Sequence, residues 1–169
     1  MTTDLATLNT LDRVAFVTLL GGVFEHAAWV AEGAFPARPF ADIAALHGAM
    51  MGVVRAASQE ERRAFLNGHP ELAGPEARAR SMTADSVSEQ GSAALDRMPQ
   101  ADADAFDRLN AAYRRKFGFP FIVAVRGRDR AEILRIFEAR VLRGETEEEA
   151  TALDEIALIT RMRLDRLLA

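Results

Sequence analysis

The sequence of 169 residues contains no cysteine, and Lys116 is the only lysine among its 21 basic residues. Without a thiol, the chain forms no disulfide framework, cysteine–zinc site, iron–sulfur cluster or cysteine nucleophile. A pyridoxal phosphate enzyme, or any other enzyme that forms a lysine Schiff base, would have to use Lys116. The two absences therefore remove cysteine chemistry and leave one position for Schiff-base chemistry.

The chain also lacks a basic run and a long apolar segment. Its formal net charge is −4, which is not the electrostatic signature of a nucleic-acid-binding protein. No apolar stretch reaches the roughly 18 to 20 residues that span a bilayer, and residues 1–5 have neither the basic region nor the apolar core of a signal peptide. We therefore expect a soluble, cytoplasmic protein that binds neither nucleic acid nor membrane.

Helix-forming residues dominate the rest of the composition. Alanine supplies 32 of the 169 residues, whereas valine and isoleucine clusters are short and scattered. We expect one all-α domain, residues 1–169, of seven or eight helices. Apolar spacing and the flanking capping and breaking residues predict helices over 11–20 (capped by Thr10), 26–34, 42–57, 59–66, 84–98, 102–117, 129–142 and 146–168.

One segment departs from the helical pattern. Phe117–Val125 contains glycine, proline and β-branched residues, which predict an extended segment near residues 119–125, along or through the helical core. An extended chain among helices has no ladder partner for its backbone N–H and C=O groups, so these need side chains or a ligand. A small planar molecule rich in amide-like donors and acceptors suits such a backbone.

The tetrapeptide Asn67-Gly-His-Pro70 is a candidate site. A residue that precedes proline has a restricted backbone, so His69 presents its imidazole from a fixed position at a helix end. Fixed placement suits a general acid or base near neutral pH. The alternative is that His-Pro merely ends a helix.

A second candidate lies at Ser86, Glu89 and Gln90. Their spacing of i, i+3 and i+4 places a hydroxyl, a carboxylate and an amide on one face of a helix. The alternative is a capping box, since Ser-x-x-Glu is also the pattern that satisfies the amides of a first helical turn. Both interpretations remain open from the residues alone.

Taken together, these motifs resemble the 2-oxo-4-hydroxy-4-carboxy-5-ureidoimidazoline (OHCU) decarboxylase family of urate degradation. The resemblance covers nearly the whole chain, and several motifs in one order are more specific than any single one. The motifs are Gly-Gly-Val-Phe-Glu-His-Ala-Ala-Trp-Val30, His69-Pro-Glu-Leu-Ala-Gly74, Ser86-Val-Ser-Glu-Gln90, Leu109-Asn-Ala-Ala-Tyr113, Lys116-Phe-Gly-Phe-Pro-Phe-Ile122 and Ile159-Thr-Arg-Met-Arg-Leu164.

The resemblance implies an all-α homodimer that needs neither metal nor organic cofactor. Its implied activity is that of a carboxy-lyase of purine metabolism, which converts OHCU to (S)-allantoin and carbon dioxide. Carried over position by position, it implies His69 and Glu89 as catalytic residues. The implied substrate-binding positions are Pro70, Ser86, Val87, Ser88, Gln90, Phe121, Ile122, Val123, Ala124, Val125 and Arg163.

The chemistry of this reaction fits a chain without a cofactor. Loss of carbon dioxide leaves an electron pair that the adjacent ring C=N of OHCU accepts, so neither pyridoxal nor thiamine is required. The protein has to orient the substrate, deliver a proton to one face of C5, and remove the hydroxyl proton. We assign proton handling to His69, with Glu89 tuning it or holding N–H groups, and we assign the carboxylate or ureido end to Arg163.

Two other functions compete with this interpretation. A metal site would draw on His26, His47, His69 and Glu25, but their spacing matches no local ligand pattern, and we expect His26 and His47 to be structural. A non-catalytic helical interaction partner of other purine-catabolic enzymes would explain the amphipathic helices. A partner without catalysis would have no need to keep all five of the polar site residues, His69, Ser86, Glu89, Gln90 and Arg163.

Overall fold

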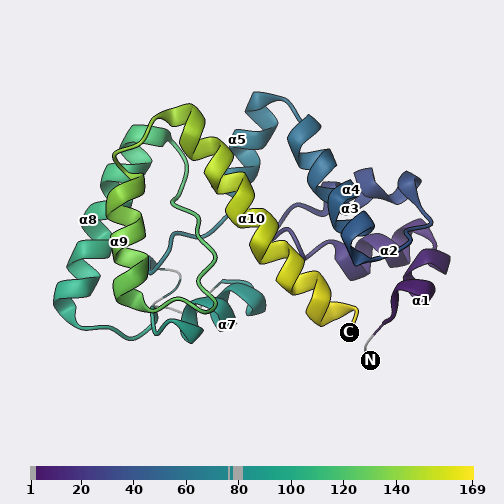
Figure 1. Cartoon of the computed structure of the whole chain (residues 1–169), viewed down its shortest axis with the longest axis horizontal. Coiled ribbons are helices and arrows are strands. Elements are labelled where there is room, and N and C mark those ends of the chain that lie inside the picture. The colour runs from purple at the N-terminus through teal and green to yellow at the C-terminus, as the bar shows by residue number, and fades with distance from the viewer. Residues whose placement is uncertain (1–2, 76, 78–81) are drawn as a thin grey trace. The chain divides into compact units, whose positions relative to one another are not determined.

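The computed structural model describes residues 3–75, 77 and 82–169. Regular structure in that part of the chain is helical (Figure 1), which confirms the all-α prediction. The chain divides into two compact units, each described by itself: unit 1 is Met1–Gly68 with Ala157–Ala169, and unit 2 is His69–Ile156. None of the described helices is both long enough and apolar enough to cross a membrane.

Unit 1 is built on short helices. Its core contains Phe16, Leu20, Val30, Leu46 and Met50, each fully shielded from solvent. Helix α3 packs against both α2 and α4. The elements of this unit are α1 (Leu5–Thr10), α2 (Arg13–Leu20), α3 (Ala28–Ala34), the 3₁₀ turn η1 (Phe35–Ala37), α4 (Ile43–Ala56), α5 (Gln59–Asn67) and the last part of α10 (Glu145–Leu167).

The predicted first helix over 11–20 is wrong at its N-terminus. Two helices, α1 and α2, meet there, and Asp12 rather than Thr10 caps the second, because its carboxylate accepts from the N–H of Ala15 at 2.8 Å. The Thr10 hydroxyl instead donates to the carbonyl of Thr7 at 2.7 Å. Because this hydrogen bond joins Thr10 to the preceding turn, Thr10 is the last residue of α1 and does not cap α2.

Unit 2 contains longer helices. The predicted helix over 84–98 stops early, because Ala94 adopts a left-handed conformation (φ 54°) that an α-helix does not accommodate. Gly118, with φ 74°, ends α8 as glycine commonly does. The elements are α7 (Ala84–Ser92), α8 (Gln100–Phe117), α9 (Arg130–Arg140) and the first part of α10.

An aromatic cluster forms the core of unit 2. The ring of Tyr113 contacts those of Phe117, Phe119, Phe121 and Phe137, with centroids 4.5–5.9 Å apart. Burial, and then a hydrogen bond to a buried carboxylate, raise the pKa of the Tyr113 hydroxyl. The phenol therefore stays protonated and acts as a donor inside the core.

That carboxylate belongs to Glu148, which is completely shielded from solvent. It accepts a hydrogen bond from the Tyr113 hydroxyl and three from Arg140: Nε lies 2.9 and 3.1 Å from its two oxygens, and Nη2 lies 3.0 Å from Oε2. Glu148 therefore has a structural role in the core of unit 2.

The predicted extended segment is confirmed. Residues 120–125 adopt neither helix nor strand, and Phe119–Val125 are all buried. The segment lies against α9, since Phe121 stacks on Phe137 at a centroid distance of 3.8 Å (Figure 1). We call residues Phe121–Val125 the strip.

Candidate functional site

The loop of residues 69–74 carries His69 and Pro70, both partly exposed, directly after α5. Three contacts within unit 2 hold this loop. The carbonyl of Leu72 accepts from Asn110 Nδ2 at 2.8 Å, and Glu71 pairs with Arg114 at 2.9 Å. The third contact is made by α7.

Gln90 joins the loop to α7. Its Oε1 accepts from the N–H of Ala73 at 2.8 Å, and Ala73 has a strained left-handed backbone with φ 53°. Its Nε2 donates to the carbonyl of Glu71 at 3.5 Å and to the sulfur of Met82 at 3.2 Å. Gln90 therefore has a loop-holding function beside the substrate contact predicted for it.

Helix α7 starts earlier than a Ser86 capping box requires. Thr83 is the N-cap, and its hydroxyl accepts from the N–H of Ser86 at 3.3 Å. Ser86 is thus an interior residue of the helix, so the capping alternative for Ser86 and Glu89 is wrong. A helix does not need a second cap within its first turn.

The face of α7 that carries the predicted site residues is buried. Ser86, Glu89 and Gln90 are 5%, 8% and 5% exposed. Val87 is half-buried, whereas Ser88 is exposed and lies 3.5 Å from the guanidinium of Arg126, one residue beyond the strip. The predicted spacing on one helix face is confirmed, and a buried carboxylate on that face needs polar partners.

The strip has a polar environment on one side. The carbonyl of Ile122 accepts from Arg140 Nη1 at 2.7 Å, and the N–H of Ala124 donates to Glu155 at 2.7 Å. The carbonyl of Ala124 accepts from Arg128 Nη1 at 2.9 Å. Side chains thus satisfy part of this backbone, one of the two outcomes that the sequence left open.

Arg163 lies in unit 1, on the last part of α10. Its Nη2 pairs with Glu25 Oε1 at 2.9 Å, its Nη1 donates to the carbonyl of Val23 at 3.1 Å, and both charged side chains are almost completely buried. Glu25 lies in the turn after α2 and has a left-handed backbone with φ 56°. The pair fixes the position of the guanidinium.

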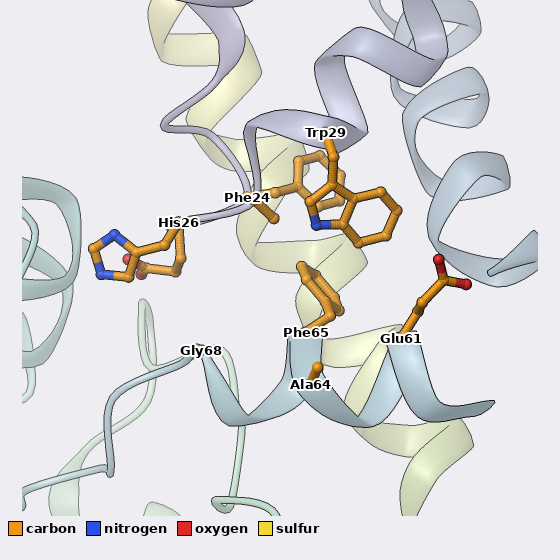
Figure 2. Close-up of a pocket in the computed structure, with 9 residues that line it drawn as sticks. Phe24, His26, Trp29, Glu61, Ala64, Phe65 and Gly68 are labelled. Atoms are coloured by element: carbon orange, nitrogen blue, oxygen red, sulfur yellow. The ribbon is translucent and has the colours of Figure 1, made fainter. Parts of the chain in front are cut away.

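Unit 1 also contains a cavity of about 330 Å³ that the sequence did not predict (Figure 2). The rings of Trp29 and Phe24 both pack against that of Phe65, with centroids 6.0 and 6.3 Å from its centroid. Glu25 and Gly68, the residue before His69, also line the cavity, and the imidazole of His26 points away from the three rings. The motif ending at Val30 was the only sequence signal for this region.

The histidines do not form a metal centre in the described part of the chain, where no three potential ligands come together. His47 Nε2 lies 3.0 Å from the Thr160 hydroxyl, in agreement with the structural role expected of it. His26 is exposed in the turn before α3. Lys116, the one lysine, donates to the carbonyl of Val141 at 2.9 Å.

The described residues define a class: an all-α protein in which one face of a helix buries a hydroxyl, a carboxylate and an amide and is tied to a loop that carries a histidine. Such groups suit acid–base chemistry on a small polar ligand. The chain belongs to the OHCU decarboxylase family, because the family model of that description matches residues 9–165.

Similar proteins support the assignment. The 2-oxo-4-hydroxy-4-carboxy-5-ureidoimidazoline decarboxylase of Halalkalicoccus jeotgali is 39% identical over 160 residues, covering 95% of this chain and 89% of the relative. The enzyme of that name from Haloferax volcanii is 40% identical over 157 residues, covering 93% and 91%. A crystal structure of (S)-allantoin synthase matches with a TM-score of 0.78 and 26% identity over 99% of this chain. The match covers only 54% of the allantoin synthase chain, so the present chain spans about half the length of that protein.

Proposed function

We propose that this chain is a carboxy-lyase that converts OHCU to (S)-allantoin and carbon dioxide in urate degradation. Family membership and two relatives of that name, at 39% and 40% identity, support the reaction. One structural observation carries the assignment to these residues. Helix α7 has its own cap, buries Ser86 and Glu89, and is tied through Gln90 to the loop that carries His69.

In the proposed mechanism, the electron pair of the breaking bond to carbon dioxide moves into the ring, where the C=N group accepts it. His69 then transfers a proton, either to C5 or from the hydroxyl group that becomes a carbonyl. Glu89 orients or tunes this imidazole, or holds substrate N–H groups. Arg163 binds the carboxylate or the ureido end as a fixed cation.

The remaining positions orient the substrate. On this proposal Pro70, Ser86, Val87, Ser88 and Gln90 line one side of the pocket. The backbone of the strip offers hydrogen-bond donors and acceptors at fixed spacing. No electron-accepting cofactor enters the mechanism, since the substrate itself delocalises the electron pair.

The direct test generates OHCU from urate with urate oxidase and hydroxyisourate hydrolase, adds the chain, and follows optically active allantoin by circular dichroism. We expect the chain to form (S)-allantoin faster than the spontaneous reaction does. His69→Asn should remain folded and lose about 10²- to 10⁴-fold in rate, the usual contribution of a general acid or base. No acceleration by the native chain would support the alternative, a non-catalytic partner of purine-catabolic enzymes.

The resemblance further supports a homodimer, and we propose this assembly together with a cytoplasmic location. Light scattering coupled to gel filtration should give twice the mass of the 18.5 kDa chain. A monomer at micromolar concentration would contradict the proposed assembly. Cell fractionation tests the location separately.

A further inference from the structure

The strip is held from one side by an ion pair that reproduces part of a β-strand. Glu155 accepts from the N–H of Ala124 at 2.7 Å, and Arg128 Nη1 donates to the carbonyl of the same residue at 2.9 Å. The two side chains also pair with each other, at 3.2 Å. A carboxylate oxygen and a guanidinium N–H thus occupy the places of the C=O and N–H of a neighbouring strand.

From Ile122 to Ala124 the contacts alternate as they do in a strand, before the turn in which the carbonyl of Val125 accepts from the N–H of Arg128 at 3.1 Å. In an extended chain the backbone groups of residues i and i+2 point to one side, and those of residue i+1 point to the other. Ile122 is bonded by Arg140, and Ala124 by Arg128 and Glu155, so these contacts lie on a single side. Within the described residues, no hydrogen bond reaches the N–H or C=O of Val123, between them.

Val123 is only 4% exposed, so its two backbone groups are shielded from bulk water as well. Buried backbone groups without partners are rare in folded proteins and are destabilising unless water or a ligand satisfies them. One N–H donor and one C=O acceptor on the same residue match the adjacent C=O and N–H groups of a ring amide or urea.

We propose that Arg128 and Glu155 are positioning residues, which hold the strip from behind so that the backbone of Val123 pairs with an amide edge of the substrate. This inference rests on the proposed function. Neither side chain contacts the reacting atoms; each acts through Ala124.

The alternative is that Arg128 and Glu155 only stabilise the fold, and this explains the ion pair less well than a positioning role does. The side chains of Arg128 and Glu155 are 26% and 13% exposed, and partly exposed ion pairs stabilise proteins little. The chain also offers a matched comparison. Arg130 and Asp102 form a pair of 2.7 Å in the same unit, with side chains 28% and 33% exposed, and among the described residues neither side chain forms a hydrogen bond to the strip.

The test compares Glu155→Ala with Asp102→Ala in the OHCU assay. Glu155→Ala removes the acceptor of Ala124 and the partner of Arg128, so we expect KM to rise about tenfold while kcat changes much less, as for a loss of ground-state binding. Asp102→Ala should retain the native KM. Glu155→Gln, which keeps an acceptor oxygen, should recover most of the loss.

An NMR titration with (S)-allantoin measures ligand binding at Val123 directly, and this measurement does not depend on the stability of the variant. In the native chain we expect the amide resonance of Val123 to shift on addition of allantoin, and in Glu155→Ala about tenfold more allantoin should be required. If Glu155→Ala fails to fold, Arg128→Met replaces it with the same expectation.

Two results overturn the inference while leaving the proposed function intact. One is an active native enzyme in which Glu155→Ala and Asp102→Ala have equal KM values. The other is a Val123 amide that does not respond to allantoin. A native chain without OHCU decarboxylation would contradict the proposed function itself.

Discussion

At the scale of single residues, Glu25 combines two unfavourable features. Its backbone is left-handed, with φ 56°, and its carboxylate is removed from water. Such a backbone costs on the order of 1–3 kcal/mol and is retained where surrounding structure requires it. Here the Glu25 backbone places its carboxylate 2.9 Å from the buried guanidinium of Arg163, and this ion pair offsets the cost of burying the positive charge.

We expect Glu25→Ala to lower the free energy of unfolding by about 3–5 kcal/mol, because Arg163 stays buried without that carboxylate. Urea denaturation measures the change. Glu32→Ala is the control, since Glu32 pairs with Arg13 at 3.8 Å with both side chains well exposed, and should cost less than about 1 kcal/mol. Equal losses in the two variants would mean that the buried pair contributes no more than a surface pair.

At the scale of the element, α7 carries its cap and its buried polar face on different residues. Thr83 caps the first turn, while Glu89 lies on the buried face in the second turn of the helix. The sequence allowed Ser86 and Glu89 to form either a capping box or a site. Because Thr83 caps the helix, these two residues are left on its buried face.

Thr83→Ala and Glu89→Gln should change different quantities: the first should lower stability, and the second should lower turnover. The first removes the cap and should lower stability by about 0.5–2 kcal/mol with kcat nearly unchanged. The second keeps the shape of the side chain, and turnover should fall with little effect on stability. Thermal melts and the coupled allantoin assay, run on both variants, measure this. A Glu89→Gln variant with native turnover would remove Glu89 from the mechanism.

The packing of α4 against α10 in unit 1 introduces a pH dependence. Burial is the main cause that lowers the pKa of His47 from 6.5, and Arg161 adds to it. Asp165 opposes this shift, and Arg55 contributes slightly to it. The unfolded chain therefore binds a proton at His47 more readily than the folded chain does. The contribution of His47 to stability is fully present above the unfolded pKa of 6.5 and is lost as the pH falls from there through the lower pKa of the folded state.

We expect unfolding in urea to require less denaturant at about pH 5 than at about pH 7.5. His47→Gln keeps an amide that can bond to the Thr160 hydroxyl but does not titrate, so part of that difference should disappear. The same pH dependence in both proteins would show that other groups cause it.

At the scale of the whole molecule, the reaction is expected to proceed without a metal or an organic cofactor. Dialysis against excess EDTA should therefore leave turnover within assay error, because the ring of the substrate accepts the electron pair. A zinc enzyme treated in the same buffer serves as the control. Activity that disappears with EDTA and returns with an added divalent cation would contradict the mechanism.

Local chemistry made much of the helical structure predictable. Asp42, Ser58 and Asp129 each precede an apolar or amphipathic run, and each caps a helix in the structure. The proline and glycine around Phe119 likewise predicted an extended segment. These signals act within four or five residues, so they can be read from a linear sequence.

Competition between nearby signals was harder to predict. Thr10 and Asp12 both suit a cap, and the outcome depends on where α1 ends. Ser86 and Glu89 match a capping box, but Thr83 takes that position. A short sequence pattern indicates that a residue is able to cap a helix, but it does not indicate which of two suitable neighbours is the cap.

Composition and local pattern were sufficient for the helical class, the extended strip and the motifs shared with the OHCU decarboxylase family. Contacts between distant residues required the tertiary structure. Glu148 stands in a run of three glutamates and is a buried partner of Arg140, and Glu155 bonds to the strip from 31 residues away along the chain. Burial and pairing at such separations arise from packing, which determines whether a charge on an amphipathic helix meets water or another chain segment.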